Sequence, residues 1–295
     1  MSGAGAMTPA PDGAPQPAEG AVNEMLEASA ELRARWSRGE TTTNCWLTMP
    51  APFAAEIASH AGFDSLCIDM QHGLVDYGAL TGMLQATSAS ATPTLVRVPW
   101  NEAGVLMRVL DAGAAGVIVP LVDSAAEAER AVSACRYPPR GTRSFGPVRA
   151  GLVHGADYFE RADTSVMVFV MIETQKALDD LEAILDTPGL DGVYVGPADL
   201  SLSLGFPPET DSTREEHQRA IKRVVAACHQ RGLAVGLHTA GPEFASLAAR
   251  WGVDFVTIAT DASALRLELQ RRVTAFASAT DRGAASEPGS ATEPA

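Results

Sequence analysis

Lysine is nearly absent from this chain. Lys176 and Lys222 are its only two lysines, and both fall in segments whose apolar residues follow a helical spacing. Enzymes that form a Schiff base with a carbonyl substrate need a lysine in the active site. Because neither lysine follows an expected strand, the sequence argues against Schiff-base catalysis.

Cysteine is also scarce. The four cysteines form no C-x-x-C pair, and two of them lie inside apolar runs. This pattern disfavours a zinc knot and a disulfide framework. We therefore expect buried free thiols, as in a reducing cytoplasm, at Cys45, Cys67, Cys135 and Cys228.

No apolar stretch reaches the ~18 residues of a membrane span, and no basic region followed by an apolar one marks a signal peptide. Positive charge is in deficit, with 22 Lys and Arg against 36 Asp and Glu and a formal net charge of −14. Nucleic acids and anionic membranes repel an acidic chain. These absences predict a soluble, cytoplasmic protein that acts on small molecules, with no nucleic-acid or membrane partner.

Both ends of the chain are dominated by Ala, Gly, Pro and Ser and show no apolar periodicity. Such composition is typical of disordered segments. We expect a disordered tail over 1–22 and a second one that begins at about Ser278 and includes all of 283–295. A single domain is expected over 23–282.

Between the tails, apolar runs typical of strands alternate with segments of helical spacing. Several helical segments end at a glycine, which favours helix termination. The expected strands are Asn44–Met49, Ser65–Asp69, Thr94–Val98, Gly116–Pro120, Val166–Ile172, Gly192–Gly196, Ala234–Leu237 and Phe255–Ala259. The expected helices are Thr81–Ser88, Glu102–Asp111, Ala125–Cys135, Gln175–Leu185, Thr213–Arg231, Pro242–Trp251 and Ala262–Phe276, and the terminating glycines are Gly62, Gly113, Gly232 and Gly252.

Strands that alternate with helices predict a parallel sheet with right-handed crossovers. Eight such units in about 250 residues favour an α/β fold of the closed (β/α)8, or TIM-barrel, type. An open doubly wound sheet is the rival fold. No G-x-G-x-x-G follows the first expected strand, so the dinucleotide-binding form of that rival has no support.

Two segments interrupt the alternation. Arg136–Asp163 is long and rich in proline and arginine, and Leu202–Asp211 is short and irregular. Long loops in a compact domain usually serve a function or an interface. The arginines of the longer loop would suit the phosphates of a coenzyme A substrate or contacts between subunits.

Polar side chains at the carboxyl ends of the strands are the candidates for catalysis, because a barrel builds its active site there. His72 follows the second strand beside Asp69, and an imidazole suits acid–base chemistry at neutral pH. Arg97 ends the third strand, where a buried guanidinium needs an anionic partner. That partner is either a bound carboxylate or a carboxylate of the protein in a structural ion pair.

The fifth and sixth strands end in carboxylates, Glu173 and Asp199. Two neighbouring carboxylates can hold one hard cation and leave positions for water and a chelating substrate. Asp199 would alternatively cap the helix that follows. His238, at the end of the seventh strand, would line the far side of the pocket or fill the barrel mouth. The other histidines carry no catalytic prediction, and His60, His217 and His229 are expected to face solvent.

Several of these residues lie in strings that resemble the HpcH/HpaI aldolase family, the class II pyruvate aldolases related to citrate lyase β-subunits. The strings include GFDSLCIDMQHG, VRVPWNE and VMIETQKALDDLEAILDTPGLDGVYVGPADLSLSLGFP, and matching segments run from about Asn44 to Phe276. The last string is highly specific to that family. The resemblance implies a metal-dependent carbon–carbon lyase that cleaves or forms 4-hydroxy-2-oxoacids, with a pyruvate enolate and an aldehyde as the reacting partners.

The resemblance also implies roles for individual residues. Glu173 and Asp199 would bind a divalent cation (Mg²⁺, Mn²⁺ or Co²⁺). Arg97 would hold the pyruvate moiety and stabilise the enolate oxygen. His72 would exchange a proton with the aldol hydroxyl, helped by Asp111 of an adjacent subunit.

The resemblance further implies a substrate-carboxylate site and an assembly. The backbone around Gly196, Pro197 and Ala198 would meet the carboxylate, as a helix N-terminus favours anions. The implied assembly is a homohexamer in which the final helix of each barrel is exchanged with a neighbouring subunit.

Two positions depart from the family pattern. Gln71 stands where the best-known members have Glu, and Met171 where they have Gln. Neither change removes a metal ligand, so we expect the chemistry to survive and the substrate preference to differ. The alternatives are a citrate-lyase-like acyl-CoA lyase, an enzyme that joins the enolate to another oxoacid, and a metabolite-binding barrel without catalysis. The last would require loss of the strand-end polar residues, all of which are present.

Overall fold

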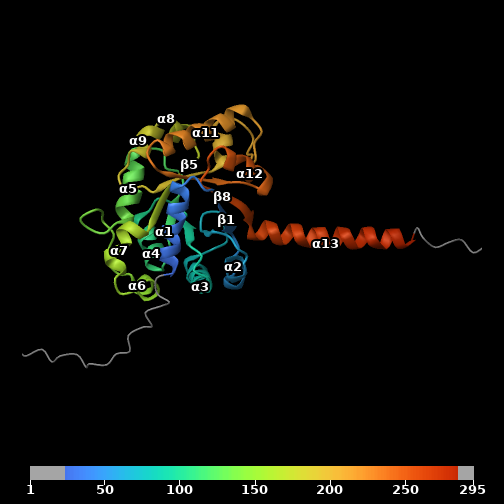
Figure 1. The fold of residues 1–295 in the computed structure, drawn as a ribbon, viewed down its shortest axis with the longest axis horizontal. Coiled ribbons are helices and arrows are strands. Elements are labelled where there is room, and N and C mark those ends of the chain that lie inside the picture. Colours follow the sequence, from blue (N-terminus) through green and yellow to red (C-terminus); the bar gives the residue numbers. More distant parts are fainter. Residues whose placement is uncertain (1–23, 285–295) are drawn as a thin grey trace, which may run out of the picture.

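Eight parallel strands, hydrogen-bonded in sequence order, close into a barrel in the computed structural model, which describes residues 24–284 (Figure 1). Every expected strand is confirmed, and no end differs from the prediction by more than two residues. The closed barrel excludes the open sheet. The strands are β1 (Thr42–Leu47), β2 (Ser65–Asp69), β3 (Thr94–Arg97), β4 (Gly116–Val119), β5 (Met167–Ile172), β6 (Gly192–Val195), β7 (Ala234–His238) and β8 (Phe255–Thr260).

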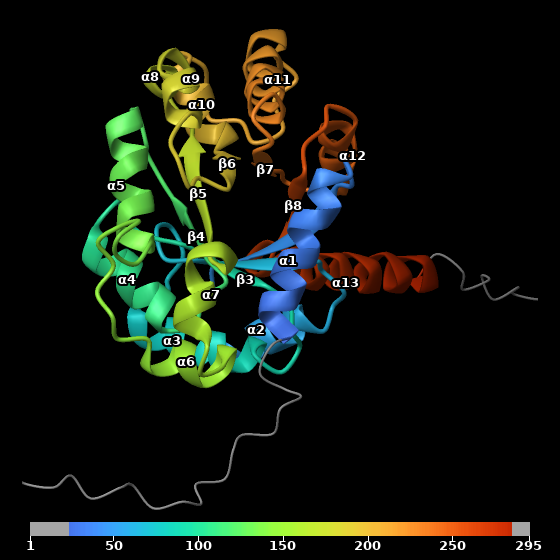
Figure 2. The ribbon, with the colours of Figure 1, turned by 60° about the vertical axis from the view of Figure 1, so that its left-hand side comes forward.

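Helices surround the barrel in the described part of the chain (Figure 2). Those expected from the spacing are present, although the one predicted over Gln175–Leu185 is divided into two helices at Asp180. The glycines expected to end helices have φ between 69° and 94°, a conformation that glycine adopts without strain. The helices are α1 (Glu24–Ser37), α2 (Pro52–Ser59), α3 (Tyr77–Thr87), α4 (Ala103–Asp111), α5 (Ala125–Cys135), α6 (Val148–His154), α7 (Tyr158–Ser165), α8 (Gln175–Asp179), α9 (Leu181–Leu185), α10 (Pro197–Ser203), α11 (Glu215–His229), α12 (Pro242–Arg250) and α13 (Asp261–Ala284).

The predicted tails need one correction. Residues 1–22 and most of 283–295 lie outside the described residues. The last helix, α13, continues to Ala284, so residues 278–284, which we assigned to the tail, are helical. In Figure 1 this helix projects away from the barrel, and its apolar side chains at Leu265, Leu269, Val273 and Phe276 are more than half exposed.

The two-residue alternation of each strand divides the core into two parts. In β5, Val168, Val170 and Ile172 pack against the helices, whereas Phe169 and Met171 point into the barrel. The interior is filled by bulky side chains, including Trp46 and Tyr194. A side chain with the inward parity at the last position of a strand, or one beyond it, therefore faces the open end of the barrel.

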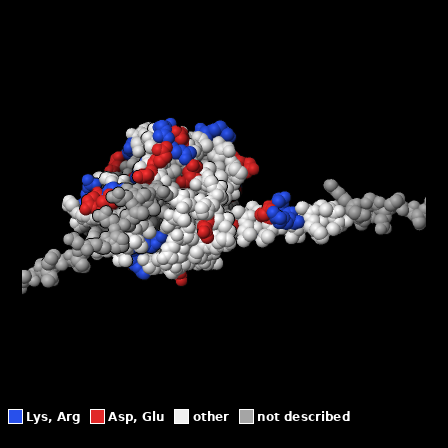
Figure 3. All heavy atoms as spheres, turned by 60° about the horizontal axis from the view of Figure 1, so that its bottom comes forward, with Lys and Arg blue, Asp and Glu red and all other residues white. Residues whose placement is uncertain are grey.

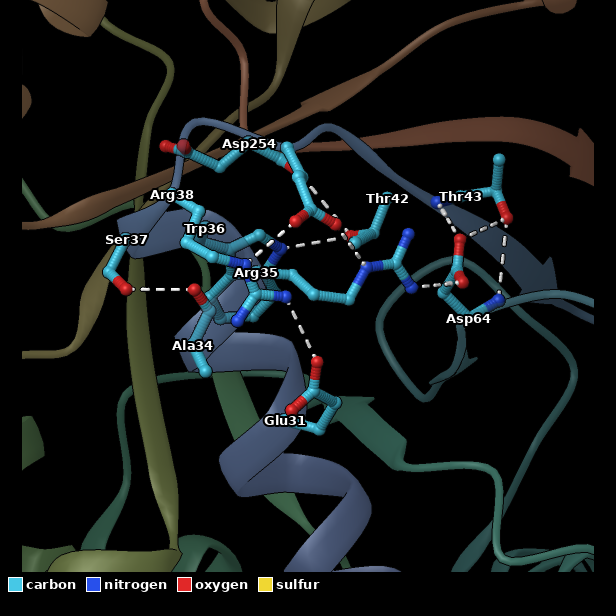
Figure 4. A network of polar contacts seen from close by, with 11 residues as sticks. Glu31, Ala34, Arg35, Trp36, Ser37, Arg38, Thr42, Thr43, Asp64 and Asp254 are labelled. Carbon is cyan, nitrogen blue, oxygen red and sulfur yellow. Dashed lines mark hydrogen bonds and ion pairs between the residues drawn. The ribbon is translucent and has the colours of Figure 1, made fainter.

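The helix α1, which the sequence analysis did not predict, covers the amino-terminal end of the barrel. Its Trp36 stacks on Phe255 with ring centroids 5.3 Å apart and donates a hydrogen bond through Nε1 to Thr42 Oγ1 (2.9 Å) (Figure 4). Arg35 donates to Asp64, which also accepts from the backbone of Thr43 (2.7 Å). These contacts hold α1 against the amino-terminal end of the barrel, opposite the end where the strands terminate.

Part of the irregular segment after α5 folds into the helices α6 and α7. Its arginines Arg136, Arg143 and Arg149 bond to other parts of the chain, whereas Arg140 is exposed. Arg136 pairs with Asp191 (3.1 Å) and also donates to two backbone carbonyls. Arg149 donates to the carbonyl of Leu84 (3.0 Å) and to Ser88 Oγ (2.7 Å). Because these guanidinium groups are already engaged, the phosphate-binding interpretation of the loop loses its support.

The four cysteines are free and buried, as predicted. Within residues 24–284 no helix combines the length and hydropathy needed to cross a membrane. On the face shown in Figure 3, acidic and basic side chains are interspersed and do not form large patches of one sign.

Packing inside the barrel predicts that one added methyl group lowers the stability of the fold. A Cβ at Gly236 in β7 would overlap the rings of Phe255 and Tyr194, so Gly236→Ala should lower the free energy of unfolding by about 1–3 kcal/mol. Gly104→Ala is the matched control, because an added Cβ there meets nothing and helix α4 gains from alanine. Urea unfolding of both variants tests this, and equal stabilities would contradict it.

Candidate active site

A cavity of about 190 Å³ opens at the carboxyl ends of the strands. It brings together nearly all the predicted site residues, from loops and strands that are far apart in sequence. Asp111 does not line it. The lining residues are His72, Arg97, Met171, Glu173, Tyr194, Gly196, Pro197, Ala198, Asp199, Thr210 and His238.

Arg97 has a protein partner, as the ion-pair alternative expects. Its Nε and Nη2 donate to the two carboxylate oxygens of Asp69 at 2.9 and 2.6 Å, a bidentate geometry. The parallel register places the two residues side by side at the ends of β2 and β3. Burial favours the neutral form of Asp69, but the ion pair with Arg97 outweighs it and lowers the pKa of that carboxyl.

The pairing with Asp69 leaves Arg97 available to a ligand. No hydrogen bond to Nη1 exists within residues 24–284, and the side chain lines the cavity. The guanidinium lies 5.1 Å from the centre of the Trp46 ring. Trp46 therefore packs against the Arg97 guanidinium, which also lines the cavity.

Glu173 is a buried carboxyl, 2% exposed, directly after β5. One oxygen accepts a hydrogen bond from the backbone N–H of Leu121 (2.8 Å). Burial, together with the negative charge of nearby Asp199, raises the pKa of Glu173 to about 7. An anion that is this poorly stabilised by the protein is well suited to a cation.

Asp199 lies in the first turn of α10 and does not cap it. The N-cap residue is Gly196, and no side-chain cap hydrogen bond forms there. Asp199 makes no hydrogen bond or ion pair with any described residue, although it is half-buried beside Glu173. A Cβ at Gly196 would collide with the Glu173 carboxylate, so glycine is required for this close approach.

These observations fit a divalent cation. Two adjacent carboxylates, one buried and one without a partner, offer the oxygen ligands that such a cation prefers. Across residues 24–284, no group of three or more His, Cys, Asp or Glu side chains could share a metal ion. Two protein ligands leave most coordination positions for water and substrate, as catalysis by a bound metal requires.

His238 faces the same cavity from the end of β7. Its ring meets Trp46 edge-on at 5.1 Å, and its Nδ1 lies 3.4 Å from the hydroxyl of Tyr194. Burial, helped by the charge of Arg97, lowers the pKa of His238 to about 4. The imidazole is therefore neutral at physiological pH, and it lines the pocket rather than merely filling the barrel mouth.

Comparison with known proteins agrees with this geometry. A family model described as HpcH/HpaI aldolase/citrate lyase matches residues 42–266. The chain belongs to the HpcH/HpaI aldolase/citrate lyase family.

Similar proteins in this family cover most of the chain. The chain is 39% identical over 235 residues to the hydroxypyruvate/pyruvate aldolase of Rhizorhabdus wittichii. The aligned region covers 80% of this chain and 94% of that protein. It is 36% identical over 247 residues to the 2-keto-3-deoxy-L-rhamnonate aldolase of Klebsiella pneumoniae, with coverages of 82% and 91%. The crystal structure of a family member from Burkholderia cenocepacia matches with a TM-score of 0.78 at 33% identity, over 83% of this chain and 98% of that one.

His72, the predicted acid–base residue, is exposed, whereas His217 and His154 are buried. His72 is exposed at the cavity rim, and its backbone N–H donates to Asp69 (3.3 Å). His217, expected to face solvent, is instead buried, with Nε2 2.9 Å from the carbonyl oxygen of Pro197. This correction has a physical reason, because α11 turns that side chain inward behind the active-site helix α10. His154, in α6, is also buried.

Asp111, which the family pattern assigns to a neighbour's site, ends helix α4 outside the cavity of its own chain. Its carboxylate accepts a hydrogen bond from Arg143 Nη2 (2.7 Å). The Arg143 side chain is fully buried and also donates to the hydroxyl of Tyr158 (3.1 Å). The carboxylate of Asp111 is therefore held at a defined place on the outside of the barrel.

The structure also identifies site residues that the sequence analysis missed. Asp69, Trp46, Tyr194 and Thr210 either line the cavity or position its charged groups. The inward parity of the strands could have found the first three, but Thr210 lies in an irregular segment without such a signal. Of the two family departures, Met171 lines the cavity, and Gln71 has a buried side-chain oxygen without a hydrogen-bond partner in the described chain.

The raised pKa of Glu173 predicts a pH-dependent stability. Between its unfolded value of 4.5 and about 7, the folded state holds more protons than the unfolded state, so stability falls as pH rises through this window. Glu173→Gln should stabilise the protein in EDTA by about 1–3 kcal/mol at about pH 8 and change it little at about pH 4. The measurement is urea unfolding, with exposed Glu216→Gln as control. An equal effect at both pH values would refute the assignment.

Proposed function

We propose that this chain is a divalent-metal-dependent aldolase that cleaves and forms 4-hydroxy-2-oxoacids through a pyruvate-type enolate. The proposal rests on a single cavity that is lined both by two carboxylates and by a guanidinium. Glu173, which accepts one backbone hydrogen bond, and Asp199, which has no partner among the described residues, supply carboxylate oxygens, and Arg97 supplies a guanidinium. The Rhizorhabdus wittichii relative, named for hydroxypyruvate and pyruvate, supports a 2-oxoacid donor.

In this proposal Glu173 and Asp199 hold the cation, which is Mg²⁺, Mn²⁺ or Co²⁺. When bound, the cation supplies Lewis-acid stabilisation of the negative charge that develops on the 2-oxo oxygen. The N-terminus of α10 at Gly196, Pro197 and Ala198 receives the substrate carboxylate, because backbone N–H groups there lack helical partners.

Arg97 holds the 2-oxoacid and stabilises the enolate oxygen through the donor that Asp69 leaves unused. The carboxylate of Asp69 positions the guanidinium, so Arg97 is ordered before substrate binds. Such preorganised charge stabilises a transition state without the cost of reorienting a flexible group.

His72 accepts the proton of the C4 hydroxyl during cleavage. The electrons of that O–H bond then form the aldehyde carbonyl, the C3–C4 bond breaks, and its electron pair forms the enolate. In the reverse direction His72 returns the proton to the new alkoxide. This role is supported by the position of His72, which lines the same cavity as Arg97.

The assembly is also part of the proposal. A homohexamer would bring Asp111 of one subunit to the active site of the next, where it would assist His72. Exchange of α13 between subunits would cover the exposed apolar side chains of this helix. The four buried free thiols support a cytoplasmic location.

Metal removal tests the core of the mechanism. EDTA should abolish pyruvate release from 4-hydroxy-2-oxoacids, and added Mn²⁺ or Mg²⁺ should restore it, because no lysine lies at the cavity. Pyruvate release is followed by a coupled dehydrogenase. Full activity in metal-free protein, or a covalent adduct trapped by borohydride, would refute the mechanism.

Two substitutions separate the proposed roles. His72→Ala should slow aldol cleavage roughly 10²–10⁴-fold while metal-assisted deuterium exchange into pyruvate continues. Arg97→Ala should impair both reactions, since both pass through the enolate. The measurements are retro-aldol turnover and deuterium exchange by NMR on the same preparations. Wild-type cleavage by His72→Ala, or retention of both activities by Arg97→Ala, would show that the roles are wrong.

A further inference from the structure

A chain of hydrogen bonds runs through the barrel interior and ends at His238. Asn44 Nδ2 donates to Ser65 Oγ (2.9 Å), and Thr257 Oγ1 donates to Asn44 Oδ1 (3.1 Å). Thr257 Oγ1 lies 2.6 Å from the Tyr194 hydroxyl, which lies 3.4 Å from His238 Nδ1. Asn44, Ser65, Tyr194 and Thr257 are fully buried, so water cannot replace these partners.

The direction of this chain determines where His238 carries its proton. Thr257 has given its single hydroxyl proton to Asn44, so it can only accept from Tyr194. Tyr194 has then used its own proton and can only accept from His238. His238 Nδ1 must therefore be the donor, which leaves Nε2 without a proton in the neutral ring.

The second nitrogen of His238 is consequently a hydrogen-bond acceptor. The ring lines the cavity, and no partner for Nε2 exists in the described chain. Because burial and Arg97 disfavour the charged form, the imidazole does not become a donor on both sides. A half-buried acceptor that faces a ligand pocket is available to a hydroxyl of the ligand.

The shared contact with Trp46 brings His238 and Arg97 close to each other. The Arg97 guanidinium lies 5.1 Å from the centre of the Trp46 ring, and the His238 ring lies 5.1 Å from the same ring. Under the proposed function, Arg97 holds the 2-oxoacid that becomes the enolate. We therefore expect an oxoacid held by Arg97 to extend its carbon chain near the acceptor of His238, since both residues line the cavity.

We propose that His238 determines donor specificity, its Nε2 accepting a hydrogen bond from a hydroxyl on C3 of the 2-oxoacid donor. This inference rests on the proposed aldolase function and specifies its donor class. A 3-hydroxy-2-oxoacid satisfies the acceptor, whereas the methyl group of pyruvate leaves it unpaired. A site that bonds a substrate hydroxyl discriminates against the analogue that lacks it.

Kinetics with one fixed aldehyde and two donors test the inference. We expect wild-type protein to show higher kcat/KM for 3-hydroxypyruvate than for pyruvate. His238→Phe keeps a ring against Trp46 but removes the acceptor, and should lower this ratio roughly tenfold, the value of one hydrogen bond. His238→Gln restores an acceptor and should recover much of the ratio. Exposed His60→Phe is the matched control and should leave the ratio unchanged.

Nitrogen NMR of histidine-labelled wild-type protein provides an independent measurement. The signals missing from His238→Gln assign the residue, and their shifts report which nitrogen carries the proton. We expect a protonated Nδ1 and an unprotonated Nε2, with Nε2 shifting when 3-hydroxypyruvate is added and less so with pyruvate. A proton on Nε2 would overturn the inference.

The two proposals fail in different ways. If no 2-oxoacid reacts with any aldehyde in the presence of metal, the proposed function is wrong. If the protein is an aldolase but prefers pyruvate, or if His238→Phe leaves the donor ratio unchanged, only the role of His238 is wrong.

Discussion

The two-residue alternation of eight parallel strands is the constraint on which the rest of this molecule depends. Closing the sheet forces every second side chain into a shared interior, and the interior positions at the upper edge are Asp69, Arg97, Glu173 and His238. Below them the same parity buries bulky side chains such as Phe169 and Phe255, and α1 covers the lower end. The polar groups therefore gather at the carboxyl end of the barrel, where they line one cavity.

The charged side chains at this end of the barrel differ in how many hydrogen bonds and ion pairs the protein gives them. Arg97 and Asp69 neutralise each other through two hydrogen bonds, so this pair is stable before a ligand binds. Glu173 and Asp199 repel each other and have few partners, so this pair is unstable without a cation. Low polarizability around buried groups magnifies both effects. The site is thus preorganised on one side, and under the proposed function a cation completes it on the other.

Much of the candidate site could be predicted because barrel chemistry is confined to strand ends. His72, Arg97, Glu173, Asp199 and His238 were recognisable as polar residues after apolar runs, and all line one cavity. The sequence did not predict the helix α1 or the burial of His217. In both cases the decisive contacts are with residues distant in the chain, as with Trp36 and Phe255, and local spacing carries no information about them.

By itself, the sequence determined the strands, the direction of their side chains and the set of polar residues at one end, since these follow from short-range periodicity. Only the tertiary structure decided which groups are partners. It paired Arg97 with Asp69, gave Asp199 no partner within residues 24–284, and connected His238 through Tyr194 to Thr257. These outcomes depend on register and side-chain packing across the barrel, because the protonation and availability of a buried group are set by neighbours that are remote in sequence.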